Sequence, residues 1–257
     1  MKKIFVSLVL TLCLLLSVIS LSSCEDWIGD PSISGALEKT DKLDEYHMVM
    51  NMNMMMRVDG KTTVFPTKYT VKVKGANTDS PTVYTVTETE IAGEKSKTEI
   101  YCEGEDAYIA YNGKGENAKL SEIKDVIAKI DSSSTVDAII KDIPADLIED
   151  VEFKENIDDS ETLSLNLSEE HAKEIFSEMI GSINDLAGNE TLDNCSIKNF
   201  LVKITVKDGY ILDYVIGFDL VSEVAGFELT ICVDADVSFV NPGKNVEITP
   251  PQGFEKK

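Results

Sequence analysis

Methionine recurs at every second position from residue 48 to residue 56, and this alternation constrains the fold more than any other feature of the sequence. Side chains two residues apart in an extended chain point to the same side, so a period of two predicts a β-strand. One side of this strand carries Met48, Met50, Met52, Met54 and Met56. The other side carries Val49, Asn51, Asn53, Met55 and Arg57. The sequence therefore predicts a sheet with one apolar face.

Two Asp-Gly pairs, Asp59-Gly60 and Asp208-Gly209, separate alternating segments and predict two-residue hairpin turns. Pro66 predicts a bulge or an edge position, because proline cannot donate to a strand ladder. The stretch from Gly113 to Lys119 lacks the spacing of a phosphate-binding loop, and we expect a turn there. The connections are too short for helical crossovers, so the pairing should be antiparallel. Further strands are expected over residues 67–73, 82–91, 96–103, 107–111, 151–154, 162–167, 200–206, 210–220, 227–239 and 246–248.

Helix-like apolar spacing predicts helices over residues 35–45, 120–130, 136–143 and 168–187, with Ser34 as the cap of the first. The long strands offer more apolar surface than these few helices can cover, so the sheet should bend around them. The sequence thus predicts an α+β fold, in which a strongly curved antiparallel β-sheet forms an unclosed half-barrel wrapped around a few helices.

The first residues have the pattern of a secretory signal, because Lys2 and Lys3 precede an apolar run from Ile4 to about Ile19. This run is shorter than the roughly 20 residues of a membrane-spanning helix. Leu21-Ser22-Ser23-Cys24 resembles a bacterial lipobox, which implies cleavage before Cys24 and a diacylglyceryl group on its thiol. We expect a signal peptide over 1–23, a lipidated tether over 24–34 and a single domain over 35–257. The expected location is the extracytoplasmic face of the cell membrane.

The charge of the chain limits its partners. From Cys24 onward it has 22 basic and 46 acidic residues, a net charge of −24 once Lys2 and Lys3 are removed with the signal. Such a surface repels nucleic acid and anionic lipid headgroups. We therefore expect no nucleic-acid partner, and the lipid on Cys24 is the expected contact with the membrane. No pattern in the sequence points to a particular protein partner.

The cysteine and histidine residues of the sequence form no recognisable catalytic or metal-binding motif. Three cysteines remain in the domain, and an odd number leaves either one disulfide and a free thiol or no disulfide. They are Cys102, Cys195 and Cys232, and their spacing matches no zinc signature. His171 is expected to be solvated, and His47 lies on the polar side of its strand. We expect no enzymatic activity, no metal and no cofactor.

Several motifs together resemble a known family. They are the lipobox, a short N-terminal helix, a "VDGK" hairpin at 58–61, a central helical insertion, a "KDGY" hairpin at 207–210 and the closing "NPGKNVEITPP" at 241–251. This combination resembles the LolA/LppX-like superfamily of bacterial periplasmic carriers and lipoproteins, with Gram-positive lipoproteins of that type as the nearest relatives. The resemblance implies an unclosed β-barrel whose concave side, covered by helices, holds a cavity for acyl chains or lipidated proteins.

Two interpretations of the methionines remain open. In one, they pack against the helix over 168–187, and the protein is an envelope interaction or scaffold lipoprotein with a filled core. In the other, they line a groove for a lipid or other apolar small molecule, because unbranched, polarizable side chains adapt to many shapes. The candidate groove residues are Met48, Met50, Met52, Met54, Met56, Tyr69, Val71, Phe176, Met179, Tyr214 and Phe218.

Overall fold

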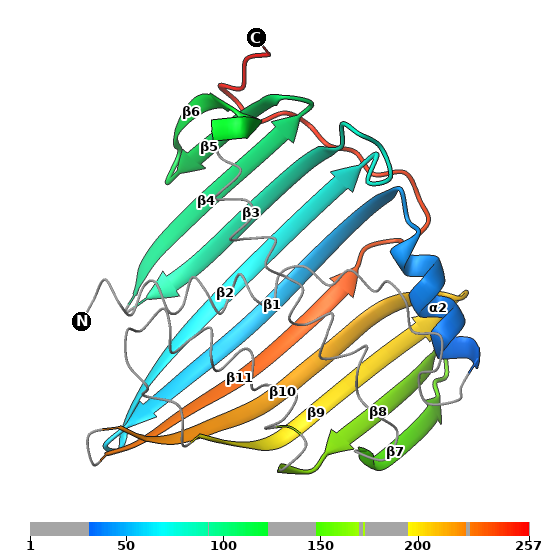
Figure 1. The fold of residues 1–257 in the computed structure, drawn as a ribbon, viewed down its shortest axis with the longest axis vertical. Helices are drawn as coiled ribbons and strands as arrows, with labels where there is room; N and C mark the ends of the chain where they lie inside the picture. Colours follow the sequence, from blue (N-terminus) through cyan, green and yellow to red (C-terminus); the bar gives the residue numbers. More distant parts are fainter. Residues whose placement is uncertain are drawn as a thin grey trace.

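The computed structural model describes residues 31–91, 93–122, 148–169, 172, 195–224 and 227–256. Within these ranges the chain forms one antiparallel sheet of eleven strands and the helix α2, Pro31–Asp41 (Figure 1). The strands are β1 Glu45–Val58, β2 Lys61–Lys74, β3 Thr82–Ile91, β4 Glu94–Glu103, β5 Asp106–Tyr111, β6 Lys114–Lys119, β7 Ile148–Glu155, β8 Glu161–Leu167, β9 Ser196–Lys207, β10 Tyr210–Val224 and β11 Phe227–Phe239.

The strand order in the sheet is β6-β5-β4-β3-β2-β1-β11-β10-β9-β8-β7. It consists of two runs, β1 to β6 and β7 to β11, and within each run every strand pairs with the next strand along the chain. The pairing of β1 with β11 joins the two runs in the middle of the sheet. The two ends of this order, β6 and β7, are edges, so the sheet is not closed into a barrel. The predicted unclosed antiparallel sheet is confirmed.

The predicted hairpin turns are also confirmed. Asp59 and Gly60 have φ values of 50° and 73°, and Asp208 and Gly209 have values of 54° and 72°. Positive φ at both central residues is the requirement of a type I′ turn, whose twist matches that of the strands beside it. These turns place β1 against β2 and β9 against β10.

A third turn of this kind corrects the prediction for residues 113–119. Asn112 and Gly113 have φ values of 49° and 77°, and the residues after them form strand β6, paired with β5. The sequence did not indicate this strand because β6 is an edge strand of mainly exposed polar residues, without apolar alternation.

Two further expectations differ from the structure. Helix α2 begins at Pro31, before the predicted cap Ser34, since proline is well tolerated in the first turn of a helix. Residues 246–248 form no strand, since the amide of Val246 donates to the Glu45 carboxylate and the carbonyl of residue 247 accepts from the Lys72 ammonium, so these backbone groups bond to side chains. Residues 120–122 are helical, and the rest of that predicted helix, the helix over 136–143 and most of the helix over 168–187 lie outside the described residues.

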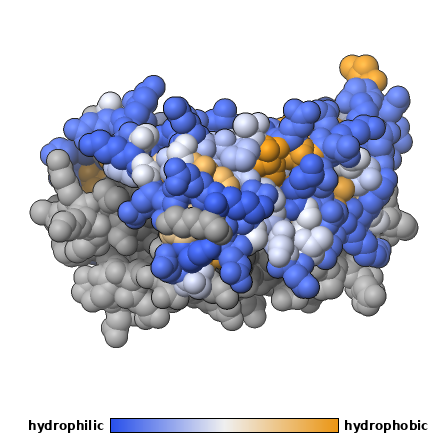
Figure 2. Space-filling view, turned by 90° about the horizontal axis from the view of Figure 1, so that it is seen from above, coloured by the Kyte–Doolittle hydropathy of each residue, from blue (hydrophilic) through white to orange (hydrophobic). Residues whose placement is uncertain are grey.

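The two faces of the sheet have different roles. The inner face, defined here as the face that bears Met48, holds a continuous cluster of buried apolar side chains from β1, β2, β8, β9, β10 and β11. Ala36 and Leu37 of α2 belong to this cluster. The outer face carries exposed polar residues such as Asn51 and Asn53 of β1. From above, along the long axis of Figure 1, the visible surface is largely hydrophilic with a few small hydrophobic patches (Figure 2).

One part of the outer face is covered by the C-terminal segment, residues 240–256. Its Ile248 and Phe254 pack against a cluster that contains Tyr101 and Tyr108, and the ring centroids of Tyr101 and Phe254 are 4.6 Å apart. Asn117 of β6 donates a hydrogen bond to the Gly253 carbonyl at 2.8 Å and accepts one from the amide of residue 255 at 2.9 Å. The segment therefore runs from the centre of the sheet toward the β6 edge (Figure 1).

Candidate functional site

The methionine row, defined as Met48, Met50, Met52 and Met54, lies at the centre of the inner face. Its side chains are 4%, 0%, 1% and 1% exposed, in that order. Met50 stands between Tyr69 of β2 and Val237 of β11, and Met54 stands between Phe65 and Val233. The alternating residues Asn51 and Asn53 are exposed on the outer face. The central position of β1 thus surrounds the row with apolar side chains on both sides.

The row leads to an opening at the β1–β2 turn. Met56 continues the alternation but is only partly buried. Beside it lies an open pocket of about 310 Å³ lined by Met56, Val58, Asp59, Lys61 and Thr63. Ligand pockets in proteins have volumes of about 300–1,000 Å³, so this opening is at the small end of that range. It is the place where the methionine side of β1 meets the surface.

The structure brings most of the other candidate residues to the same face. Tyr69, Val71, Tyr214 and Phe218 are 3%, 7%, 1% and 4% exposed and belong to the same cluster as the methionine row. Cross-strand register places Tyr214 beside Val237, which in turn stands beside Met50. Phe176 and Met179 lie outside the described residues.

The hydroxyl of Tyr214 is a polar group on this apolar face. It is fully buried and has no hydrogen-bond partner among the residues that the structure describes. Burial raises the pKa of this phenol well above its usual range, so the hydroxyl stays protonated. A buried polar group without a partner costs free energy, and most such groups in proteins are paired. The alternation of β10 placed Tyr214 on the inner face, but no sequence signal shows that its hydroxyl is unpaired.

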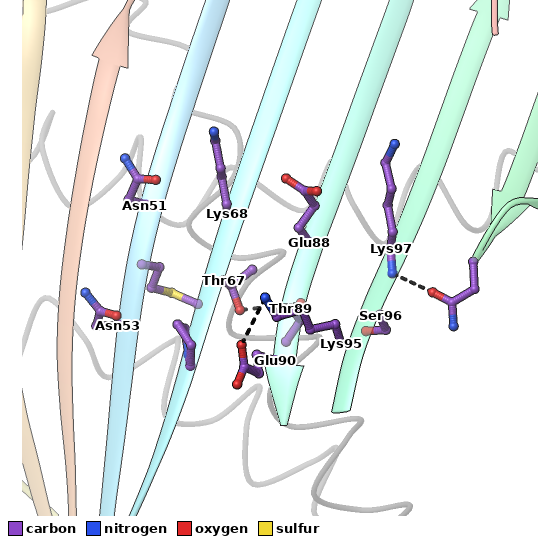
Figure 3. A pocket seen from close by; sticks show the side chains of 13 residues that line it. Asn51, Asn53, Thr67, Lys68, Glu88, Thr89, Glu90, Lys95, Ser96 and Lys97 are labelled. Atoms are coloured by element: carbon purple, nitrogen blue, oxygen red, sulfur yellow. Dashed lines mark hydrogen bonds and ion pairs between the residues drawn. The ribbon is translucent and has the colours of Figure 1, made fainter. Parts of the chain in front are cut away.

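A second, larger pocket lies where β2 and β3 separate, and sequence reasoning missed it. The β2–β3 ladder ends at the pair Thr67 and Thr89, whereas β2 continues to Lys61 beside β1 and β3 continues to Ile91 beside β4. Pro66 is the next residue of β2, which confirms the edge position that proline predicted. The pocket has a volume of about 630 Å³ (Figure 3). Its lining is Asn51, Met52, Asn53, Pro66, Thr67, Lys68, Glu88, Thr89, Glu90, Lys95, Ser96, Lys97 and Asn112.

The charges around this pocket are mixed. The ammonium of Lys95 lies 3.8 Å from the Glu90 carboxylate, and the ammonium of Lys97 lies 3.2 Å from the Glu99 carboxylate. Lys68 and Glu88 are cross-strand neighbours on the outer face, and neither has an ion pair within the described ranges. Figure 3 shows both side chains projecting in the same direction from β2 and β3. Sequence reasoning could have found this pocket only through Pro66, which marks the end of the ladder.

The described residues offer little for metal or acid–base chemistry. In these ranges there is no group of three or more histidine, cysteine, aspartate or glutamate side chains that could hold a metal ion. Among the described residues, Cys102, Cys195 and Cys232 form no disulfide, which agrees with the second of the two alternatives. His47 is half-buried, and both its burial and the nearby Lys72 lower the pKa of its imidazole. His171 lies outside the described residues.

In the part of the chain that the structure describes, no helix has the length and apolar character needed to cross a membrane. The sheet and its inner face define the class of this protein: an open antiparallel sheet with one apolar face and a polar outer face. The particular family follows from sequence comparison. Residues 33–252 match DUF6612, a family of unknown function, and the chain belongs to that family. No curated protein shows significant similarity to the sequence.

Three solved structures are similar to the chain at low sequence identity. LprF from Mycobacterium bovis has a TM-score of 0.36 and 12% identity, over 83% of this chain and 92% of LprF. A DUF1329 family protein from Desulfovibrio piger has a TM-score of 0.23 and 10% identity, over 82% and 88%. A domain named for outer membrane lipoprotein sorting, from Vibrio parahaemolyticus, has a TM-score of 0.22 and 8% identity, over 77% and 87%.

Proposed function

We propose that this protein is an extracytoplasmic lipoprotein, anchored through Cys24, that binds a lipid or another hydrophobic ligand along the methionine row. The observation that supports the proposal is the inner face itself, where adaptable methionine side chains form a buried apolar row that ends at an open pocket beside Met56. A ligand that leaves a bilayer loses about 0.8 kcal/mol of favourable burial per methylene, so its binding site must offer a long apolar surface. The methionine row and its neighbours on β2 and β11 provide such a surface.

The anchor is tested by metabolic labelling with an alkyne analogue of palmitate. The native chain should incorporate the label and sediment with membranes, whereas Cys24→Ser should do neither. Cys232→Ser is the matched control, because it removes a domain thiol and should leave the labelling unchanged. Equal labelling of Cys24→Ser and the native chain would refute the anchor.

The ligand is tested on the mature chain, residues 24–257 with Cys24→Ser. Native mass spectrometry after mild purification should reveal a copurifying lipid, and a fluorescent fatty acid should be taken up. Met56→Gln should lower the uptake, whereas Met55→Gln, one residue away on the outer face, should not. A clean ligand-free spectrum without uptake would leave the envelope scaffold with a filled core as the remaining function.

A further inference from the structure

The pocket between β2 and β3 is lined by residues that belong to both faces of the sheet. Its lining comes from three successive cross-strand rows, and the middle row contains Met52, Thr67, Thr89 and Ser96, whose side chains point to the inner face. The two flanking rows contain the outer-face residues, among them Lys68 and Glu88. The lining of the pocket thus combines charged outer-face residues with Met52, a buried member of the methionine row.

This geometry follows from the end of the β2–β3 ladder. Two strands in a ladder are about 4.8 Å apart and leave no room for a ligand between them. Beyond Thr67 and Thr89, that pairing stops, while the β1–β2 and β3–β4 pairings continue. The threonine hydroxyls, 3.5 Å apart, are the last contact across the ladder before the strands separate. The pocket of about 630 Å³ lies at this separation.

We infer that this pocket is the headgroup site of an amphiphile, in which Lys68 binds an anionic group and Glu88 binds a cationic group of one zwitterionic headgroup, while the acyl chain lies along the methionine row. The inference rests on the proposed function, because the acyl chain needs the inner face. Lys95 and Lys97 already pair with carboxylates, which leaves Lys68 as the lysine of the pocket without an ion pair in the described ranges. Glu88 stands directly opposite it in register and is likewise unpaired there.

A zwitterionic headgroup fits this arrangement better than a simple anion does. Glu88 would repel an anion bound at Lys68, and the chain as a whole has a net charge of −22. A headgroup that carries both signs satisfies the lysine and the glutamate together. Both side chains are exposed, so each contact should contribute modestly to affinity and mainly to selectivity.

The test compares two probes with the same acyl chain on the mature Cys24→Ser protein, by calorimetric titration below the concentration at which the probes form micelles. Lysophosphatidylethanolamine carries the zwitterion, and monoacylglycerol is its uncharged counterpart. The parent protein should prefer the zwitterionic probe. Lys68→Gln and Glu88→Gln should each reduce this preference about two- to fivefold and leave monoacylglycerol binding unchanged.

Lys203→Gln is the matched control, because Lys203 is an exposed lysine on the outer face of β9 and its change should preserve the preference. Free phosphoethanolamine, which has no acyl chain, should bind far more weakly than the acylated probe; equal binding would make the pocket a site for a small soluble zwitterion and overturn the inference. Unchanged preference in both glutamine variants would also overturn it and leave the proposed function standing. Absence of binding of both acylated probes to the parent protein would instead refute the proposed function.

Discussion

At the scale of single residues, the inner face is defined by the contrast between neighbours on one strand. Met50 is fully buried and Asn51 is exposed, although they are adjacent in the chain. Met50→Ala should therefore destabilise the protein by about 2–4 kcal/mol, since it removes buried apolar atoms and leaves a cavity. Asn51→Ala should change the free energy of unfolding by less than about 0.5 kcal/mol. Urea denaturation measures both, and similar values for the two variants would contradict the assignment of faces.

Tyr214 gives a second prediction at this scale, because its hydroxyl is buried without a partner in the described part of the chain. Tyr214→Phe should raise the free energy of unfolding of the ligand-free protein by about 1 kcal/mol, as the cost of the unpaired group disappears. Tyr84→Phe is a control of opposite sign. The Tyr84 hydroxyl donates to the Glu99 carboxylate at 2.6 Å, so its loss should lower stability by about 1 kcal/mol. A destabilised Tyr214→Phe protein would mean that this hydroxyl has a partner in solution.

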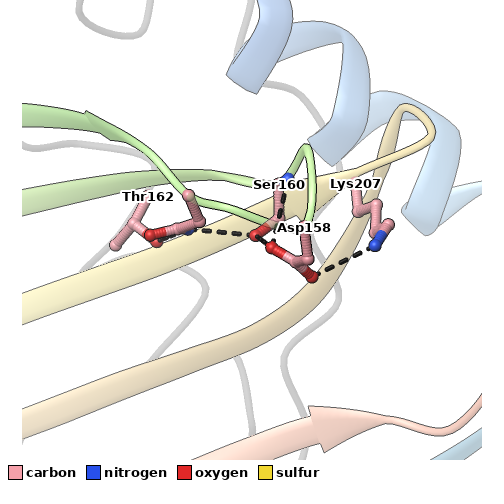
Figure 4. A network of polar contacts seen from close by, with 5 residues as sticks. Asp158, Ser160, Thr162 and Lys207 are labelled. Atoms are coloured by element: carbon pink, nitrogen blue, oxygen red, sulfur yellow. Dashed lines mark hydrogen bonds and ion pairs between the residues drawn. The ribbon is translucent and has the colours of Figure 1, made fainter.

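At the scale of elements, hairpins are held to their neighbours by side chains as well as by ladders. The turn between β7 and β8 is linked to β9 through Asp158, which accepts a hydrogen bond from the Ser160 hydroxyl at 2.7 Å and lies 3.1 Å from the ammonium of Lys207 (Figure 4). The Ser160 hydroxyl and Lys207 hold the pKa of the Asp158 carboxyl at about 2. Since β7 is an edge strand, these contacts help to keep the edge in register.

The lowered pKa predicts a dependence of stability on pH. A carboxyl whose pKa is lower in the folded state stabilises the protein above the unfolded value, near pH 4, and this contribution disappears as the pH falls toward 2. Asp158→Asn should therefore lower the melting temperature at pH 7 and reduce its decline between pH 4 and pH 2. Asp159→Asn, at the next position of the turn, should retain the parent profile. Identical profiles for the parent protein and Asp158→Asn would refute this role.

The edge strand β6 gives a second prediction at this scale. A Cβ atom at Gly115 would overlap the ring of Tyr108, which packs on the outer face with the C-terminal segment. Gly115→Ala should destabilise the protein by about 1–3 kcal/mol through this overlap. The same change in a Tyr108→Ala background should be nearly neutral, because the ring is gone. A double-mutant cycle by urea denaturation measures the difference, and equal effects in both backgrounds would contradict the contact.

At the scale of the whole molecule, the C-terminal segment connects the middle of the sheet with its β6 edge. The amide of Val246 donates to the Glu45 carboxylate at 2.8 Å, and the ammonium of Lys72 donates to the carbonyl of residue 247 at 3.1 Å. Val246 is 7% exposed, and Phe254 packs against Tyr101. Through these contacts the last residues of the chain hold strands from its first half.

Removal of residues 246–257 should therefore lower the stability of the whole sheet by roughly 2–5 kcal/mol, the cost of exposing Val246, Ile248, Phe254 and the aromatic side chains beneath them. Chemical denaturation should show one transition at lower urea concentration. Replacement of the exposed Lys244 by alanine is the control and should leave the transition in place. An unchanged midpoint after truncation would show that the segment contributes nothing to the fold.

The sequence by itself determined those features that depend only on neighbouring residues along the chain. The period of two assigned the methionines, Tyr69, Val71, Tyr214 and Phe218 to one face, because side chains of an extended chain alternate whatever the partner strand. The Asp-Gly pairs predicted their turns because aspartate and glycine tolerate the positive φ that a type I′ turn requires. Tertiary structure alone decided the pairing of β1 with β11, the burial of the Tyr214 hydroxyl without a partner in the described residues, and the path of the C-terminal segment. Each of these depends on contacts between residues far apart in the chain, which no local pattern contains.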